Sequence, residues 1–427
     1  MRQWRRPGGK PGLAPWDVVI AANLSSEVIG FVNANLGSAG LKVAMCHDYA
    51  GAPFGPFTSV PADAQAELAV KLGQRWALLC DSAHTAGYME RHTKREGVPL
   101  LASRRCYGAT YDYYDVSGSA LPPRLSETHA SAMRYCTIIS PCVPKGLSIL
   151  LRVTSMLPHI PFAACCTSWT NDVTIKVLKQ IPNLTLLDSS PRVDDIFEQT
   201  RVLLAPSIWA EAFGLVATEA CARGIPCVSS GHGGLSEANT LSTTPGFEAC
   251  AVPTTLVHDH HYVLVRRGTS LAAVEEELAH ERAAAGIANI AAAHGTNSLA
   301  ATGKAASGAE LKAQAQRLIA TFTTVATEEE ARPYADLISR LMDDDAFYAR
   351  ASDAARASGV DFIRSHRGRF AEIVEQLWDE FGQPADSDGS APSAASWGWT
   401  PSPLMPHAKA AAAAGGRIDM MSMLDVL

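Results

Sequence analysis

Two glutamates and a glycine-rich turn that lie close together in the sequence are the residues best suited to chemistry. Glu211 and Glu219 are eight positions apart, and a turn with Gly231, Gly233 and Gly234 follows them. Carboxylates can hold hydroxyl groups, whereas glycines let the backbone approach a ligand closely. Together these residues suit a ligand that carries both hydroxyls and an anionic group.

The segment around these residues predicts a strand, a loop, a helix, a second strand and the glycine-rich turn. The apolar run Val202–Ala205 predicts a buried parallel strand. Helical periodicity follows, and Gly224 and Pro226 would end that helix before a strand at Ile225–Ser229. Glu211 therefore lies at the carboxyl end of a strand and just before a helix, where ligands bind in open α/β sheets.

The start of that helix predicts an anion site. The amides of Phe213, Gly214 and Leu215 would lack partners in the first helical turn and would point at an anion. Glu219 lies one to two turns into the same helix. One carboxylate would then meet a sugar hydroxyl and the other a ribose, with a phosphate between them. The alternative is an ordinary βαβ unit whose glutamates are solvated.

This segment resembles the retaining glycosyltransferases of glycosyltransferase family 4 (glycosyl transferases group 1), which have the GT-B fold. The family pattern is a Glu, seven residues and a second Glu, set in PS.W.E.FG and followed by G.P...S..GG..E. The matching residues are Pro206, Ser207, Trp209, Glu211, Phe213, Gly214, Glu219, Gly224, Pro226, Ser229, Gly233, Gly234 and Glu237. The resemblance implies two Rossmann-like domains that face a cleft. It also implies transfer of a hexosyl group from a nucleotide diphosphate sugar to an acceptor hydroxyl, with retention.

The resemblance further implies roles for single residues. Glu211 would hold the donor sugar and orient its anomeric carbon, and Glu219 would hold the ribose. Lys145, in a Pro-x-x-Lys-Gly turn, would contact the donor diphosphate. His47 would face the donor sugar from the other domain, unless it is simply a histidine that ends a strand and is satisfied locally. Ser189 follows a strand at the place where relatives hold the base.

Negative charge grows on the diphosphate as the bond to the sugar breaks. Lys145, the helix-start amides and the amides of Gly233 and Gly234 would stabilise this charge. Relatives often carry an Arg where this chain has Ser140, so half of the positive pair is absent. No metal and no cofactor other than the donor are expected. Front-face departure and double displacement both stay open.

Alternating strand and helix patterns predict two α/β domains. Residues 1–134 predict a partial N-terminal acceptor domain with four strands, and residues 135–381 predict a donor domain with six. The family's opening strands have no counterpart, so a truncated chain or a shortened domain is expected. Residues 258–327 predict a low-complexity insertion, partly helical and partly disordered, and residues 382–427 a disordered tail.

Several local expectations are specific enough to check. Residues 1–15 are expected to form a basic lead-in, and Ala249–Val252 the sixth strand of the donor domain. The histidines within residues 258–261 are expected at the surface, because no carboxylate or Cys stands at ligand spacing. The three aspartates at 343–345 are expected to cap a helix. The resemblance to GT-B proteins also implies that the helix at Val360–Phe381 crosses back to the first domain.

Composition excludes several classes of protein. The chain of 427 residues is 47% hydrophobic and 19% charged with a net charge of −7, which indicates a globular protein and no nucleic-acid partner. Its ten Cys without a CxxC predict free thiols in a reducing, cytoplasmic compartment, or an organelle if the N-terminus is truncated. No apolar run reaches the length of a membrane span.

Two other functions fit the same sequence. The incomplete first domain suggests a non-catalytic nucleotide-sugar-binding protein or a truncated pseudoenzyme. A GT-B sugar-nucleotide epimerase would share the donor site. The acceptor, whether a sugar, a lipid or a small molecule, is unknown, because acceptor specificity lies in loops of the first domain.

Overall fold

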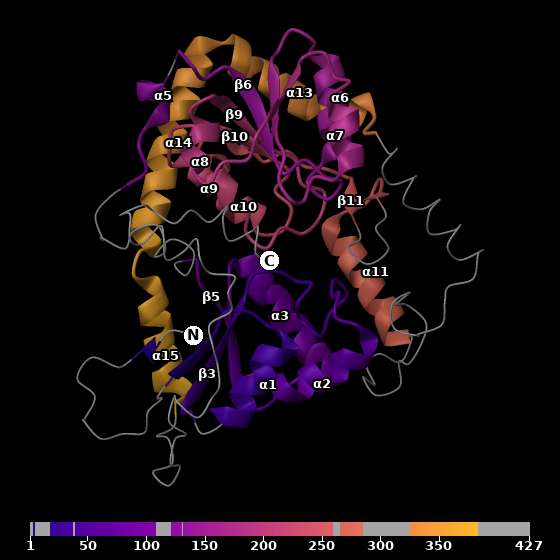
Figure 1. The fold of residues 1–427 in the computed structure, drawn as a ribbon, viewed down its shortest axis with the longest axis vertical. Coiled ribbons are helices and arrows are strands. Elements are labelled where there is room, and N and C mark those ends of the chain that lie inside the picture. The colour runs from indigo at the N-terminus through magenta and orange to yellow at the C-terminus, as the bar shows by residue number, and fades with distance from the viewer. Residues whose placement is uncertain are drawn as a thin grey trace.

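The chain folds around two five-stranded sheets and a small two-stranded ribbon (Figure 1). The computed structural model describes residues 3–4, 18–36, 39–107, 121–129, 131–258, 265–284 and 325–382. In Figure 1 the first sheet and its helices are indigo and lie below the second sheet, which is magenta. This α/β architecture of parallel sheets confirms the predicted fold class.

The first sheet has the strand order β1-β2-β3-β4-β5, and only β1 is antiparallel to its neighbour. Its elements are β1 (Gln3–Trp4), β2 (Val18–Ala21), α1 (Ser26–Asn35), β3 (Leu41–Cys46), α2 (Ala62–Leu72), β4 (Trp76–Cys80), α3 (Ala83–Glu96) and β5 (Ala102–Arg105). Ser25 caps α1, since its hydroxyl accepts from the amide of Val28. The expectation of a plain lead-in was wrong at β1. A strand of two residues is too short to leave an alternating pattern.

The second sheet is entirely parallel and has the order β10-β9-β6-β7-β8. Its elements are β6 (Tyr135–Ile139), α6 (Leu147–Met156), β7 (Phe162–Cys165), α7 (Asp172–Leu178), β8 (Leu184–Leu187), α8 (Val193–Phe197), β9 (Thr200–Ala205), α9 (Leu215–Cys221), β10 (Cys227–Ser229) and α10 (Leu235–Ala238). Counted within this unit, the order is 5-4-1-2-3, which is that of a Rossmann-like sheet. Its topological switch point lies between β6 and β9.

The sixth strand that the sequence predicts at Ala249–Val252 does not form. A 3-10 turn, η2 (Glu248–Cys250), occupies its first two residues, and a single bridge joins Ala251 to Ser229. The side-chain amide of Asn239 donates to the carbonyls of Cys227 and Cys250, at 3.1 and 3.0 Å. This buried side chain fills the place that a longer strand pairing would need.

Two helices from the later part of the chain pack against the first sheet and its helices. They are α11 (Leu271–Ala284) and α15 (Arg369–Phe381), and they lie on opposite sides of the molecule (Figure 1). Val274 and Leu278 of α11 join the same buried cluster as Tyr88, while Val374 and Leu377 of α15 pack with β3 and β4. The chain therefore returns twice to its first half.

The remaining helices cover the second sheet. They are α5 (Leu125–Thr128), η1 (Thr240–Thr243), α13 (Glu328–Asp343) and α14 (Asp345–His366). Asp344 caps α14, because its carboxylate accepts from the amide of Phe347 at 2.9 Å. The capping role expected for the aspartates at 343–345 is thereby confirmed for Asp344. Among the described helices none is both long and apolar enough to cross a bilayer.

The expectation of surface histidines was wrong for His258. This residue is only 4% exposed and lies in β11 (Val257–His258), which pairs with β12 (Val265–Arg266). Its amide donates to the carbonyl of Ile208 at 2.5 Å, so the strand is packed beside the loop after β9. His260 and His261, most of the predicted insertion and the predicted tail lie outside the described residues. All ten cysteines are free thiols.

Candidate functional site

Lys145 and Glu211 meet at the switch point of the second sheet. Lys145 follows β6 and Glu211 follows β9, and these strands are neighbours at the point where the strand order reverses. The ammonium of Lys145 donates to both carboxylate oxygens of Glu211, at 2.7 and 2.9 Å. The pair predicted from the motif is thus in direct contact.

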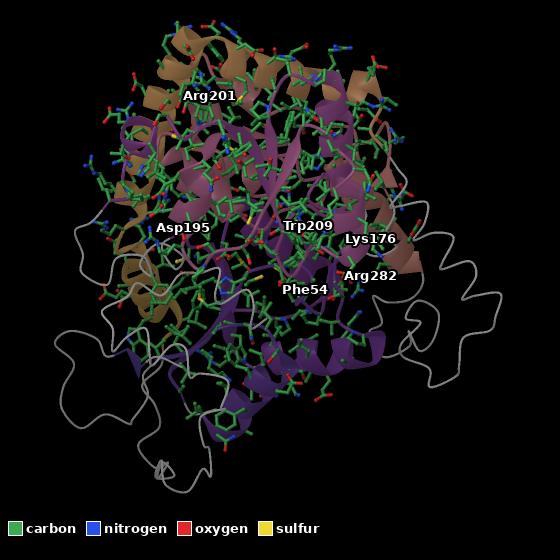
Figure 2. All side chains as sticks on the ribbon, turned by 45° about the horizontal axis from the view of Figure 1, so that its top comes forward. Phe54, Lys176, Asp195, Arg201, Trp209 and Arg282 are labelled. Carbon is green, nitrogen blue, oxygen red and sulfur yellow. The ribbon has the colours of Figure 1, made fainter. Side chains whose placement is uncertain are left out.

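The Glu211 carboxylate is buried and charged. Its side chain is 8% exposed and also accepts from the hydroxyl of Ser207 at 2.5 Å. Burial alone would raise the pKa of Glu211, but the charge and hydrogen bonds of Lys145, with the bond from Ser207, outweigh burial and lower it. The Lys145 ammonium lies 5.2 Å from the ring centroid of Trp209, which is near the middle of the molecule (Figure 2).

The glycine-rich turn contacts the backbone of Glu211. The amide of Gly234 donates to the Glu211 carbonyl at 2.7 Å, and Gly233 forms a β-bridge with Glu211. Gly233 has φ of 63°, and a Cβ there would lie 2.4 Å from the Glu211 carbonyl oxygen. Only glycine fits so close to another backbone in this conformation. The predicted turn therefore fixes the position of Glu211.

The loop between Glu211 and α9 is held by apolar packing. Gly214 precedes the helix with φ of 96°, and the Phe213 ring packs 5.3 Å from that of Tyr107. Leu215 is the first residue of α9, and Glu219 lies further along the same helix with 7% exposure. The helix-start amides and both glutamates thus lie on one continuous segment at this edge of the sheet.

His47 ends up beside Asp81, at the ends of β3 and β4. Its Nδ1 is 2.9 Å from the Asp81 carboxylate, and its side chain is 48% exposed. Burial would lower the pKa of His47, but the hydrogen bond and charge of Asp81 raise it overall. His47 is thus hydrogen-bonded within the first half of the chain, and its contact with a donor sugar stays a prediction. Two residues later, the Tyr49 hydroxyl donates to the Glu211 carbonyl at 3.2 Å.

Ser189 follows β8 and is exposed, on a different loop from Lys145 and Glu211. Its neighbour Ser190 donates to the carboxylate of Asp195 at 2.5 Å, which fixes the turn. The structure therefore places Ser189 at the carboxyl edge of the sheet. Its contact with a base stays a prediction.

Sequence reasoning missed three side chains that join the first half of the chain to this site. They are Tyr49, Thr85 and Glu237. Glu237 belongs to the motif, but nothing in the sequence indicates its partners, the first amides of α3. Tyr49 and Thr85 carry no motif, and their contacts depend on how the two sheets face each other.

Two other features of the described residues bear on the site. They contain no group of three or more His, Cys, Asp or Glu side chains arranged to hold a metal ion. A hollow of about 350 Å³ is lined by residues that include Arg134, His159 and Asn183. It lies at the amino edge of the second sheet, opposite the edge that carries Lys145 and Glu211.

The fold and the charged pair at its switch point define an α/β protein with a ligand site of the Rossmann-like class. Residues 175–245 match the family model described as glycosyl transferases group 1. The match covers Glu211, Glu219 and the glycine-rich turn, and it confirms the predicted resemblance to glycosyl transferases group 1, whereas retention and family 4 stay predictions. Lys145 and His47 lie outside it. No curated protein matches the chain.

Several solved structures are similar to this chain. The structure of Anabaena Alr3699/HepE with UDP and glucose is 13% identical, with a TM-score of 0.49 over 84% of this chain and 78% of that one. TarM is 9% identical, with a TM-score of 0.44 over 87% of this chain and 56% of that one. The trehalose-6-phosphate synthase OtsA is 16% identical, with a TM-score of 0.35 over 62% and 75%. At these TM-scores we draw no further conclusion from them.

Proposed function

We propose that this protein is a glycosyltransferase that moves a hexosyl group from a nucleotide diphosphate sugar to an acceptor hydroxyl with retention. The observation that carries the proposal is the contact between Lys145 and Glu211 at the switch point. Glu211 lies within the segment that matches the glycosyl transferases group 1 family. Among the ion pairs of the described residues, no other one joins a motif residue to the ligand-binding edge of the sheet.

The pair can serve both halves of a sugar diphosphate. An ammonium has three N–H donors, and two of those on Lys145 go to Glu211. The third is left for a phosphate oxygen without breaking the pair. In our proposal the Glu211 carboxylate accepts from hydroxyls of the donor sugar and orients the anomeric carbon.

The remaining predicted residues complete the donor site in this proposal. Glu219 holds the ribose, and Ser189 lies beside the base. His47 reaches the sugar from the end of β3. The amides of Phe213, Gly214 and Leu215, with that of Gly233, stabilise the diphosphate. The predicted Gly234 amide donates to the Glu211 carbonyl, so Gly234 supports the site through the backbone of Glu211.

The reaction exchanges one bond for another at the anomeric carbon. The bond to the diphosphate oxygen breaks, and a bond to the acceptor oxygen forms on the same face. The acceptor proton leaves with the released nucleoside diphosphate or to solvent. Negative charge on the diphosphate is stabilised by Lys145 and the backbone amides. Either front-face departure or double displacement gives retention.

The test measures nucleoside diphosphate release with a panel of nucleotide sugars and acceptors. Variants Glu211→Gln and Lys145→Ala are expected to lower turnover by about 100-fold or more, because each removes a fixed charge from the reacting groups. Lys176→Ala is the control, since Lys176 is exposed on α7, a helix that carries none of the predicted site residues. Turnover at the wild-type rate in both site variants would overturn the assignment.

The same assay separates the alternatives. Saturable nucleotide-sugar binding without any diphosphate release would indicate a non-catalytic binder. A changed sugar configuration without acceptor, seen by NMR, would indicate an epimerase. For a transferase, NMR of the product reports whether the anomeric configuration is retained.

A further inference from the structure

One carboxylate from the second half of the chain occupies the start of a helix from the first half. Glu237 lies in α10, directly after the glycine-rich turn. Its two oxygens accept from the amides of Ala83 and His84, at 2.8 and 3.0 Å. These are the first residues of α3, whose positive dipole end favours a carboxylate. The hydroxyl of Tyr107 donates to the same carboxylate.

The start of α3 also holds the loop that carries Glu211. The hydroxyl of Thr85 donates to the carbonyl of Ala212 at 3.0 Å. The hydroxyl of Tyr49 contacts His84 Nδ1 at 2.7 Å and donates to the carbonyl of Glu211 at 3.2 Å. Tyr49 and Thr85 are almost fully buried. The backbone of the Glu211 loop is therefore bonded to the first half of the chain.

These contacts meet at one place. Glu237 is three residues after Gly234, whose amide donates to Glu211. We name this set the latch: Glu237, Tyr107, Tyr49, Thr85 and the first amides of α3. The latch joins α3 to Glu211 along two routes, one through the glycine-rich turn and one through the hydroxyls of Tyr49 and Thr85.

We propose that Glu237 is a positioning residue that ties α3 to the glycine-rich turn and so holds Glu211 in its place. The inference rests on the proposed function for its catalytic consequence. A reacting group displaced by about 1 Å can lose about 100-fold in rate. A change of Glu237 is therefore expected to lower the rate of the reaction, although Glu237 is not among the residues assigned to the donor.

The test compares Glu237→Gln with Glu380→Gln. Glu380 is the matched control, because it is a carboxylate of α15 that pairs with Arg104 on the outside of the first sheet. In Glu237→Gln the amide group replaces one acceptor with a donor and cannot accept from both backbone amides. Hydrogen exchange at residues 83–86 and 211–215 of the ligand-free protein is expected to become at least about tenfold faster, with no change in the control.

The second readout is turnover. For Glu237→Gln we expect kcat to fall by about tenfold or more while the donor KM changes by less than about threefold, because orientation is lost and ground-state binding is kept. Should this variant fold poorly, Tyr107→Phe removes one hydrogen bond of the same carboxylate and is expected to give a smaller change of the same kind.

The outcomes are distinct. Unchanged exchange at residues 83–86 and 211–215 would overturn the latch. Faster exchange with unchanged kcat would overturn the positioning role. If the wild-type protein transfers no sugar, the proposed function and the positioning role fall together, and the exchange experiment alone decides whether the latch exists.

Discussion

A buried carboxylate keeps its charge only if fixed partners replace water, and Glu211 has Lys145 and Ser207 for that purpose. The pKa of Glu211 is lower than its ordinary value of 4.5. The pair therefore stabilises the fold above that pH, and this contribution is lost as the pH falls through the folded-state pKa. The Lys145–Glu211 pair of the predicted active site therefore also contributes to the free energy of unfolding.

Lys145→Met tests this role of the pair. The variant leaves Glu211 charged and buried without its main partner, which is expected to cost about 2–4 kcal/mol near pH 7. The cost should shrink toward about pH 4.5, because an unpaired, buried Glu211 has a raised pKa and takes up a proton. Urea unfolding at both pH values measures this cost, and Lys176→Met is the control because Lys176 is exposed. An equal cost at both pH values would contradict this explanation.

His47 offers a second pH-dependent measurement. Its pKa is raised above 6.5 by Asp81, although burial opposes the shift. Asp81→Asn removes the charge, so the pKa of His47 is expected to fall below 6.5. NMR titration of the imidazole protons measures the pKa of His47. His159 serves as an internal reference, because it lies at the amino edge of the second sheet, away from Asp81.

The sign for stability follows from the same shift. A raised histidine pKa stabilises the fold below 6.5, and the effect disappears as the pH rises through the folded-state pKa. Asp81→Asn should therefore destabilise the protein more near pH 6 than near pH 8. An unchanged His47 titration in the variant would show that Asp81 does not set this pKa.

At the scale of elements, turns without side chains hold the site together. Gly233 lies against Glu211, and a Cβ on Gly146 would lie 2.1 Å from the Pro206 carbonyl oxygen. Gly146 follows Lys145, so the loops after β6 and β9 touch through backbone atoms. The distance between Lys145 and Glu211 is thus set by contacts between backbone atoms. A side chain at Gly146 or Gly233 would separate the two loops.

Gly233→Ala separates close approach from backbone conformation. Gly97 has a similar φ, 70° against 63°, but a Cβ there would meet nothing within 4 Å. Gly97→Ala is expected to cost about 1 kcal/mol, the cost of a left-handed conformation alone. Gly233→Ala should cost at least about 2 kcal/mol more, because its Cβ would overlap the Glu211 backbone. Thermal unfolding of both variants makes the comparison, and equal losses would rule out the steric explanation.

Many of the strands and loops that form the site could be predicted from the sequence. The apolar runs at β6, β7, β8 and β9 have the pattern of buried parallel strands, and the motif placed Glu211 and Lys145 on neighbouring loops. The strand at Ala249–Val252 was wrong because a buried side chain, Asn239, bonds the carbonyl of Cys250 within it. The surface position predicted for His258 was wrong, because its strand borders low-complexity sequence and the composition there does not indicate a buried contact.

What the sequence could not reveal depends on the relative placement of the two sheets. Glu237 is a motif residue, yet its partners lie about 150 positions earlier, at Ala83 and His84. Such a pairing follows no local periodicity. The same holds for Tyr49, whose hydroxyl reaches Glu211 only because the loops after β3 and β9 face each other.

At the scale of the whole molecule, the two halves are joined on both sides. α15 packs on the first sheet on one side, and α11 does so on the other (Figure 1). The contact of α11 includes Arg282, which donates to Glu96 at 2.9 Å and also to Gln65. Arg282 lies near Phe54 in Figure 2, and it donates to the carbonyl of Pro53. A segment that the sequence indicated as an insertion is therefore part of the core contact between the halves.

Arg282→Met tests whether α11 is a structural tie. The ion pair is buried, with side-chain exposures of 10% for Arg282 and 5% for Glu96. Removing the cation leaves Glu96 charged and buried, which is expected to cost about 3–5 kcal/mol. Arg95→Met is the control, because its partner Glu276 is 59% exposed and such a pair contributes at most about 1 kcal/mol.

The loss should also be visible locally. Glu96 accepts from the amide of Gly55 at 2.8 Å, so hydrogen exchange at this amide should become faster in Arg282→Met and stay unchanged in Arg95→Met. Urea unfolding measures the loss in the free energy of unfolding, and hydrogen exchange shows which part of the chain is affected. If both variants lose the same small amount of stability and the Gly55 amide stays protected, α11 packs against the first half without stabilising it. A large loss confined to Arg282→Met would show instead that this helix holds the two halves together.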